Sequence, residues 1–486
     1  MKTRIASGKR RSRGTELSRG VTSVPTDPGT RRGETETPRF RVLIAGGGVA
    51  ALEALLALRQ LAGDRVAPIL FAPDPEFRYR PLSVTEPFGL ATARNLDLLE
   101  VALEHNATFI RDGLAEVCPD RRQIRTAAGR ELDYDALLIA IGARGAEAVP
   151  GALTFRDSAD GDSFRGVLEE LERGVSHHLA FAVPGEASWP LGLYELALLS
   201  SARVHEQGLT DVELTLVTPE AHPMTIFGRR ASDAVRELLD QAGIAVRLNS
   251  RPIRFQDGRL VVDGGEAIAC DRVISLPSPQ VAPIAGIPQQ PDGFIPVDRY
   301  GGVLGVDRIY AAGDATWFPV KQGGLAAQLA DCAASAIAAL AGAAVDPQPF
   351  RPVLRGALLT EWGPRYLRAP FGEITGGAAA KSALWWPPAK VAGSYLAPYL
   401  ATKAGYRAQK GPLADLEPPY GDDASDVQSG HEDVVALALS SAEARARSRD
   451  FPGALRWLEV AEDLDLYLPR ESELKRISWQ ELARPR

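Results

Sequence analysis

The patterned part of the chain opens with a short apolar run, a glycine cluster and an amphipathic stretch. Residues 41–45 (RVLIA) are apolar enough to predict a buried parallel strand. The glycines at 46–48 break this run, and the leucines within 49–61 recur on one face, which predicts a helix. A second apolar run at 66–71 completes the order strand, turn, helix, strand. This order is the βαβ unit of a parallel sheet.

A second unit of the same kind starts near residue 178. Apolar runs at 179–183 and 212–217 predict strands, and the stretch 191–204 between them has the spacing of a helix. The first fold must then resume, and residues 307–340 supply a strand followed by a long Ala-rich helix. We therefore predict the α/β class, with two Rossmann-like dinucleotide-binding domains, the second inserted into the first.

The C-terminal part differs in composition, because it is first rich in Pro, Trp and Tyr, then acidic, then amphipathic. One copy of its tetratricopeptide-like helix pattern cannot form a solenoid, so these helices must dock on the body or on a partner chain. The predicted parts are a disordered basic tail (1–39), the first dinucleotide-binding domain (40–160 and 285–345), the second (161–284), an interface region (346–410), an acidic linker (411–430) and a helical appendage (431–486).

The first glycine cluster has the spacing of a phosphate-binding turn. Gly46 permits the tight turn, Gly48 lets the backbone approach a pyrophosphate, and Ala51 lets the helix pack close to the strand. The acidic residue expected about 20 positions later is displaced. Its slot falls near Ala72, and Asp74 lies just beyond, either reaching back to a ribose or forming a solvated turn.

Two further apolar runs end at glycine. Residues 134–141 run into Gly142, where the chain must pass close to another group. Residues 308–312 lead to Gly313 and Asp314, so a buried strand delivers a carboxylate at its end. The segment Lys321-Gln322-Gly323-Gly324 then opens the Ala-rich helix, and its small residues allow a flat ligand edge to lie against the backbone amides.

These elements, in this order, resemble the flavoprotein family with two dinucleotide-binding domains. Within that family the chain is most similar to the branch of sulfide:quinone oxidoreductases and type II NADH dehydrogenases, over about residues 40–405. The stretches that strengthen the resemblance are PEFRYRPLSVTEPFG (75–89), WPLGLYELAL (189–198), YAAGDATWFPVKQGGLAAQLAD (310–331) and LWWPPAKVAG (384–393).

The resemblance implies FAD in the first domain. Gly46, Gly48 and Ala51 would hold the pyrophosphate, and Gly142 would pass beside the cofactor. Gly313 and Asp314 would lie near its ribitol or phosphate region. Gln322, Gly323 and Gly324 would face the pyrimidine edge of the isoalloxazine, where a helix N-terminus stabilises negative charge on reduced flavin.

The second domain departs from a nicotinamide fingerprint. Its three glycine slots hold Ser188, Pro190 and Leu193. Pro190 lacks an N–H, and Leu193 is bulky where helix and strand should pack closely. Glu195 lies on the same helix, and type II NADH dehydrogenases resemble this chain in having a glutamate there. A partly buried carboxyl with a raised pKa could relay a proton to quinone. The alternative is a structural glutamate in the interface.

Lys321 is the second candidate for a catalytic role, either stabilising a reduced-flavin anion or simply solvated. Cys118, Cys270 and Cys332 lie far apart without a CxxC motif, which excludes a disulfide scaffold and a cysteine zinc site and favours a reducing compartment. Sulfide oxidation through a cysteine pair is not expected. The histidines form no ligand cluster, so no metal site is predicted.

The charge and hydropathy of the chain limit the classes of partner and the cellular locations that are expected. The net charge of -7 argues against nucleic acid. The basic tail has no apolar segment after Lys9-Arg10-Arg11, so a secretory signal is not expected. We expect no run that approaches the ~18 apolar residues of a membrane-spanning helix. We predict a cytoplasmic protein, with peripheral contact at the inner membrane face, through residues 384–405 or the tail, as the alternative.

The predicted function is two-electron transfer through FAD between a small-molecule donor and a quinone-like or other small acceptor. Two alternatives stay open at this point. One is an NAD(P)H dehydrogenase with a degenerate nicotinamide loop. The other is a flavin-stabilised interaction protein without turnover, which would use residues 431–486 to bind a partner.

The altered fingerprint gives the first testable prediction. NADH and NADPH should reduce the flavin poorly, with KM above about 1 mM, because the slots at 188, 190 and 193 remove the backbone approach to a pyrophosphate. Anaerobic reduction, followed at the flavin absorbance band with a panel of donors, measures this. Rapid bleaching by micromolar NADH would show that the loop binds nucleotide in another way.

Overall fold

The computed structural model describes residues 39–185, 189–372, 375–404 and 413–416, and nearer the C-terminus residues 439, 442–443, 445–447, 449, 451–455, 458 and 470–483. The predicted basic tail, except its last residue, lies outside these ranges. So do Ser188, most of the predicted acidic linker and much of the predicted helical appendage.

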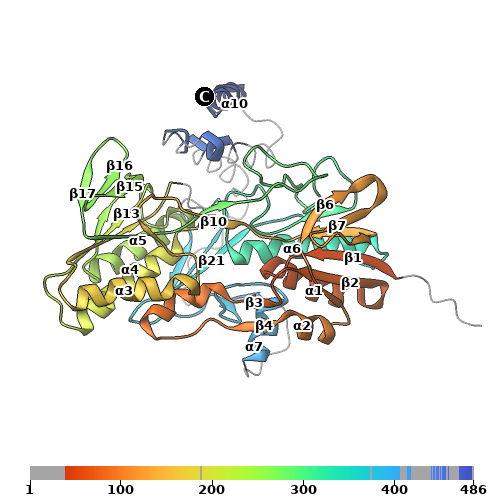
Figure 1. The fold of residues 1–486 in the computed structure, drawn as a ribbon, viewed down its shortest axis with the longest axis horizontal. Helices are drawn as coiled ribbons and strands as arrows, with labels where there is room; N and C mark the ends of the chain where they lie inside the picture. Colours follow the sequence, from red (N-terminus) through yellow and green to blue (C-terminus); the bar gives the residue numbers. More distant parts are fainter. Residues whose placement is uncertain are drawn as a thin grey trace, which may run out of the picture. The chain divides into compact units, whose positions relative to one another are not determined.

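The first sheet is parallel and has the strand order β20-β9-β1-β2-β5. Ala45 at the end of β1 pairs with Phe71 of β2 and Ile139 of β9, so the strands end at one common edge. Helices α1 and α6 pack against each other beside this sheet (Figure 1). The elements are β1 (Phe40–Ala45), α1 (Val49–Ala62), β2 (Val66–Ala72), α2 (Leu98–Glu104), β5 (Thr108–Arg111), β9 (Ala136–Ile139), β20 (Ile309–Ala311) and α6 (Gly323–Leu340).

Short elements complete the first fold. A three-stranded meander contributes Val117 and Ile124 to the same core as α1 and α6. A 3-10 helix, η2 (Arg80–Phe88), reaches across to helices α3 and α4 of the second fold. The remaining strands here are β3 (Glu76–Arg78), β4 (Asn95–Asp97), β6 (Leu114–Cys118), β7 (Gln123–Thr126), β8 (Glu131–Asp133) and β10 (Arg144–Ala146).

The second sheet is also parallel, in the order β11-β18-β12-β13-β14. Its elements are β11 (Leu153–Thr154), α3 (Gly161–Glu172), β12 (His178–Ala182), α4 (Leu191–Glu206), β13 (Glu213–Val217), α5 (Gly228–Gln241), β14 (Ala245–Arg247) and β18 (Arg272–Ser275). A hairpin extension and one linking strand accompany it: β15 (Pro252–Gln256), β16 (Arg259–Val262), β17 (Ala267–Ala269) and β19 (Ser278–Gln280).

The prediction of two Rossmann-like folds in an α/β chain is therefore confirmed. One detail differs, since Thr154 pairs with Ser275 and the second sheet thus includes residues before the predicted boundary at 161. A two-residue strand has too little pattern to be recognised in a sequence.

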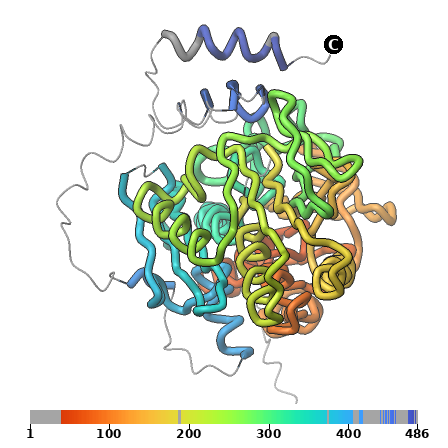
Figure 2. Tube along the Cα trace, turned by 90° about the vertical axis from the view of Figure 1, so that its left-hand side faces the viewer, coloured from red at the N-terminus to blue at the C-terminus, as the bar shows by residue number. Residues whose placement is uncertain are grey.

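The C-terminal region forms an antiparallel sheet that contacts both folds. β21 packs against α4 of the second fold and α6 of the first, and Figure 2 shows its blue strands beside α6. The elements are β21 (Val353–Leu358), β22 (Arg365–Pro370), β23 (Ala378–Ala380), β24 (Trp385–Trp386), α7 (Leu396–Lys403), β25 (Ala414–Asp415) and α10 (Arg470–Leu482).

A buried carboxylate ties this region to the first fold. Glu53 of α1 has no exposed surface, and its two oxygens accept the N–H groups of Tyr395 and Leu396 at 2.7 Å each. These amides open α7 and would otherwise lack partners. Asp331 of α6 lies beside Glu53, and burial raises the pKa of both carboxyls, so the two helices face each other across an acid pair.

The expectation that no segment has the length and composition of a membrane span is wrong for α6. Among the described residues this one helix, Gly323–Leu340, is long and apolar enough. More than half of it is buried, and Ala330, Ala333 and Ala334 are completely inaccessible within the first core. Its apolar character is that of a core helix that packs closely on α1.

Candidate functional site

The glycine turn after β1 is forced by a close approach of two strand ends. Gly46 has φ +128°, and a Cβ built there would lie 2.1 Å from the carbonyl oxygen of Ala140. Its N–H donates to the Phe71 carbonyl at 2.8 Å. Any side chain at position 46 would therefore push β1 and β9 apart at the edge where their carboxyl ends meet.

Gly48 is required for a different reason. It is the N-cap residue of α1, in an extended conformation and without a side-chain cap, and a Cβ built on it meets nothing within 4 Å. Open space thus lies against the first amides of α1, while Ala51 below is completely buried. Gly142 at the end of β9 is similarly open, with φ +69°. This uncovered helix start is the cradle that a pyrophosphate fits.

Gly313 and Asp314 bring the end of β20 to the same place. A Cβ on Gly313, where φ is +80°, would lie 3.2 Å from the Cβ of Ala50 and 3.5 Å from that of Ala326. The chain thus threads between the starts of α1 and α6. The Asp314 carboxyl beside it is partly buried, and this burial raises its pKa, while the positive charges of Lys321 and Arg80 act in the opposite direction.

Lys321 holds its own loop together. Its Nζ donates to the carbonyl oxygens of Thr316 and, at 2.7 Å, Phe318, and lies 3.8 Å from the ring centroid of Phe294. The lysine is therefore partly buried and fixed, in contrast to the solvated alternative. It still lines the pocket described below, so a positive charge faces that space.

The side chain of Gln322 is used within the protein. Its Oε1 accepts the Leu325 N–H at 2.8 Å, which caps α6, and its Nε2 donates to the Arg355 carbonyl at 2.9 Å. The role of Gln322, Gly323 and Gly324 toward an isoalloxazine stays a prediction that now concerns their backbone. A Cβ at Gly324 would lie 2.9 Å from the Gln322 side-chain amide, which would have to shift to make room for it.

Asp74 lies apart from these residues. It is exposed after β2, accepts the Glu76 N–H at 3.1 Å and lies 3.5 Å from the Arg78 guanidinium. These contacts correspond to the solvated turn that was the alternative interpretation of Asp74. A ribose contact from Asp74 would require this local turn to open, so its predicted role has no support in the structure.

A pocket of about 310 Å³ joins the first fold, the second fold and the C-terminal region. Its wall includes five of the residues predicted from sequence, together with three arginines, a lysine and a tryptophan that sequence reasoning did not select. These lining residues are Glu195, Asp314, Lys321, Gln322 and Gly323, then Arg80, Arg144, Arg156, Lys390 and Trp189.

Glu195 and Lys390 form a buried ion pair in this wall. The Lys390 Nζ lies 2.6 Å and 2.7 Å from the two Glu195 oxygens, and the Leu359 N–H donates to the same carboxylate at 2.9 Å. Glu195 is 1% exposed. Burial raises the pKa of Glu195, and Lys390 offsets part of this rise. Each charge depends on the other, because removing one partner would leave the remaining charge buried without a counter-ion.

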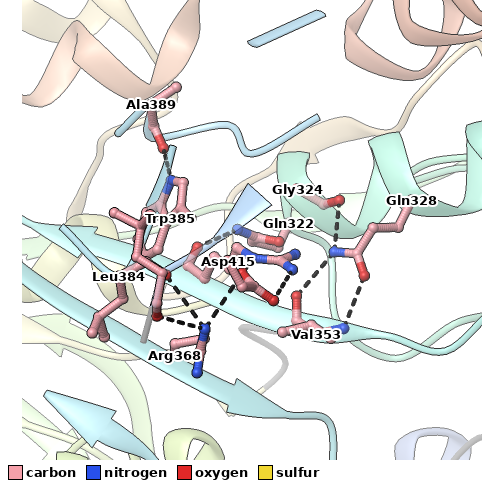
Figure 3. Close-up of polar contacts among 11 residues, drawn as sticks. Gln322, Gly324, Gln328, Val353, Arg368, Leu384, Trp385, Ala389 and Asp415 are labelled. Atoms are coloured by element: carbon pink, nitrogen blue, oxygen red, sulfur yellow. Dashed lines mark hydrogen bonds and ion pairs between the residues drawn. The ribbon is translucent and has the colours of Figure 1, made fainter. Parts of the chain in front are cut away.

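A polar network positions the loop that carries Lys390 (Figure 3). Trp385, completely buried, donates from Nε1 to the Ala389 carbonyl at 3.0 Å, immediately before the lysine. Arg355 of β21 makes a bidentate pair with Asp415 of β25 at 2.8 and 2.9 Å, and β25 in turn pairs with β24. Sequence alone offered no signal for Lys390, since it lies 195 positions from its partner.

The same network fastens α6 to β21. Gln328 donates from Nε2 to the Val353 carbonyl at 2.9 Å and accepts the Val353 N–H at 2.9 Å (Figure 3). The Gln322 side chain adds a bond to Arg355 in the same strand. The start of α6, which forms part of the pocket, is thereby fixed relative to the C-terminal sheet.

The nucleotide edge of the second fold is filled by its own side chains. Trp189 and Phe227 pack with ring centroids 5.5 Å apart, and Leu193 is completely buried at the start of α4. Glu220 follows β13, where an acid would meet ribose hydroxyls. Its carboxylate instead accepts the hydroxyls of Tyr194 at 2.6 Å and Thr218 at 2.9 Å.

Two of the three thiols lie in surroundings that disfavour the thiolate. Burial raises the pKa of Cys270 to about 11 and that of Cys332 to about 12. Cys118 accepts a hydrogen bond from the Arg121 guanidinium at 3.4 Å and lines neither cavity. Among the described residues no group of three or more His, Cys, Asp or Glu side chains could hold a metal ion.

The structure has two parallel nucleotide-type sheets that meet at one charged pocket. This arrangement is typical of oxidoreductases with two dinucleotide-binding folds. The model of the pyridine nucleotide-disulphide oxidoreductase family matches residues 40–337. The chain belongs to this family and is an oxidoreductase. The resemblance inferred from sequence is thereby confirmed, and the matched region ends before the C-terminal sheet.

Individual relatives are distant. "Oxidoreductase ptaL" of Pestalotiopsis fici is 24% identical over 68% of this chain and 92% of that protein. A sulfide-quinone reductase of Aquifex aeolicus is 26% identical over 41% of this chain and 47% of that protein. The crystal structure of the sulfide:quinone oxidoreductase from the same bacterium superposes with a TM-score of 0.62, at 17% identity, covering 79% of this chain and 99% of that one.

The cradle at α1 gives a test of cofactor binding. The wild-type protein should carry about one non-covalent FAD per chain, and Gly48→Val should abolish it, because the new side chain fills the space left for a pyrophosphate. The variant should keep its fold, since a Cβ at position 48 meets no protein atom within 4 Å. Absorbance at the flavin band and circular dichroism measure both. A colourless wild-type protein that takes up no added FAD contradicts this.

The state of the thiols gives a second test. Replacing Cys118, Cys270 and Cys332 together by Ala or Ser should leave turnover nearly unchanged, because two of them stay protonated and none adjoins the pocket. The rate with a working donor, in protein shown to be folded and flavin-loaded, is the measurement. A loss of about a hundredfold, equivalent to roughly 2.7 kcal/mol, means that a cysteine takes part.

Proposed function

We propose that this oxidoreductase holds FAD without a covalent bond and transfers two electrons from a small donor to a quinone-like or other small acceptor in the pocket. The observation that carries the proposal is the buried Glu195–Lys390 pair, which lines the same pocket as Asp314, Lys321 and Gln322. A proton-carrying pair thereby adjoins the residues expected around the flavin.

The cofactor part rests on the fit of three strand ends. Gly46 and Gly48 open the cradle at α1, Gly142 leaves space beside β9, and Asp314 lies where β20 ends. FAD would supply the two-electron chemistry when bound there. Lys321 places a positive charge near the start of α6, which favours negative charge on that edge of a ligand.

Quinone reduction needs protons as well as electrons, and the ion pair is the candidate source of a proton. Reduction of a quinone consumes two protons, which must reach the acceptor from side chains or from water at the pocket. Glu195 lines the pocket, and burial raises its pKa, so it can hold a proton nearer neutral pH than an exposed glutamate, pass it to the acceptor and regain one from water; the second proton then comes from water. Lys390 was absent from the sequence prediction and completes the role suggested there for Glu195.

The donor is a small molecule other than NAD(P)H in this proposal. Phe227, Trp189 and the inward-turned Glu220 occupy the positions that a dinucleotide would need. Relatives bear the names sulfide-quinone reductase and, in Arabidopsis thaliana, external alternative NAD(P)H-ubiquinone oxidoreductase, which supports a quinone acceptor. Quinones with long tails reside in lipid. A quinone acceptor therefore agrees with a cytoplasmic enzyme that contacts the inner face of the membrane.

The acceptor half-reaction separates a relay from a structural pair. Glu195→Gln preserves the size and the bond from the Leu359 N–H but cannot titrate, so flavin reoxidation by quinone should slow by about a hundredfold, while flavin reduction stays within about twofold. Stopped-flow absorbance measures both half-reactions. Glu206→Gln, at the exposed end of the same helix, is the matched control.

A second variant guards against loss of fold. Glu195→Gln leaves the Lys390 ammonium without its counter-ion, which costs on the order of 3–5 kcal/mol for a fully buried pair. The double change Glu195→Gln with Lys390→Met removes both charges and should restore stability without restoring reoxidation. Reoxidation at the wild-type rate in either folded variant shows that the pair is structural and that the proton comes from elsewhere.

A further inference from the structure

A second cavity, of about 480 Å³, adjoins the first pocket and shares Pro279 and Lys321 with it. Part of its wall comes from segments that follow strands of the second sheet: Arg251 follows β14, and Ser278 follows β18. The chain leaves β12 toward β13 on one side, and β18 lies on the other, so this edge is the switch point of the sheet. Open α/β sheets bind ligands in the crevice at that point.

The opposite wall belongs to the C-terminal appendage. Arg445, Arg449, Pro452 and Gly453 line the cavity and lie outside the region that the family model matches. The appendage is packed in place, since Ala442, Ala454 and Leu458 are at most 1% exposed within the core of the second fold. In Figure 2 the short blue pieces below α10 lie beside the green part of the chain.

A polar contact holds these C-terminal residues in position over the cavity. Arg445 donates from Nη1 to the carbonyl oxygen of Gly185, three residues beyond the end of β12. Lys475 of α10 pairs with Glu443 at 2.6 Å and ties the last described helix to the same segment. The appendage therefore closes the crevice of the second fold instead of hanging free beside it.

The cavity is rich in positive charge. Among its described lining residues, Arg251, Lys321, Arg445 and Arg449 are basic, and Asp292 alone is acidic. Cations gathered in a hollow with protein walls concentrate a positive potential. The Arg445 guanidinium is held at the cavity wall by its bond to the Gly185 carbonyl. Forked arginine donors match the oxygens of phosphate.

We propose that this cavity binds a small phosphate-bearing molecule of about mononucleotide size, and that the appendage forms the roof of the site. Its volume falls within the range of about 300–1,000 Å³ typical of small-molecule sites. A dinucleotide bound in the usual way is a poor match, because Pro190 caps α4 without an N–H and Leu193 is buried there. In this proposal the arginines bind the phosphate group, which a glycine-rich turn binds in other dinucleotide folds.

Titration calorimetry on the full-length protein tests this with three probes: AMP, inorganic phosphate and adenosine. AMP should bind, adenosine should bind at least about tenfold more weakly, and raising the salt concentration should weaken AMP binding because the attraction is between charges. Arg449→Gln should weaken AMP by about tenfold or more, since Arg449 is an exposed residue of the roof whose loss leaves the core intact. Arg236→Gln on α5, where Arg236 pairs with Asp240 and does not line the cavity, is the control and should bind like wild type.

The outcomes divide cleanly. If AMP binds tightly and inorganic phosphate binds weakly, the ligand is a nucleotide. If both bind with equal affinity, the phosphate group is the main determinant of binding. Either result supports the site. Adenosine as tight as AMP, unchanged AMP affinity in Arg449→Gln, or no binding of AMP and phosphate by the wild-type protein overturns it. Displacement of AMP by micromolar NADH would assign a dinucleotide and overturn the proposed size. None of these readouts depends on flavin turnover, so they stand apart from the proposed redox function.

Discussion

A charge that leaves water must find a partner, and this constraint determines how the three parts of the molecule meet. Glu195 lies on a helix of the second fold and is almost completely inaccessible. It tolerates that position because Lys390 reaches it from the C-terminal region. Arg355 and Asp415 repeat the arrangement within that region, and Glu53 satisfies the first amides of α7. The Glu195 and Glu53 contacts each cross a boundary between parts, so burial of these charges is coupled to assembly of the three parts.

The pocket inherits its chemical character from this arrangement. Two parallel sheets present their carboxyl edges toward it, which supplies glycine turns and helix starts but few side chains that can hold a proton. The C-terminal sheet contributes the missing ammonium group. A fold shared by many oxidoreductases is thereby given a particular acid–base pair by a region that the family model does not cover.

The sequence predicted those features that depend on local pattern. The strands β1, β2, β12 and β13 and the helices α1, α4 and α6 all fell close to their predicted ranges, because apolar runs and glycine turns are legible within a few residues. Features that depend on distant partners were missed. Lys390 and the inward turn of Glu220 toward Tyr194 have no local signature. Asp74 shows the reverse case, since its spacing suggested a ribose ligand while the structure gives it local partners in Glu76 and Arg78, and its cofactor role stays a prediction.

The order of these parts along the chain has a consequence for biosynthesis. Both nucleotide-type folds are complete in the chain by the end of α6, whereas Lys390, Tyr395 and Asp415 are added afterwards. At about 5–20 residues per second, several seconds of translation separate the two events. During that interval Glu195 has no lysine opposite it, and the start of α6 lacks its bonds to β21. In the nascent chain the pocket therefore lacks the part of its wall that contains Lys390 and Val391 until the C-terminal region has been synthesised.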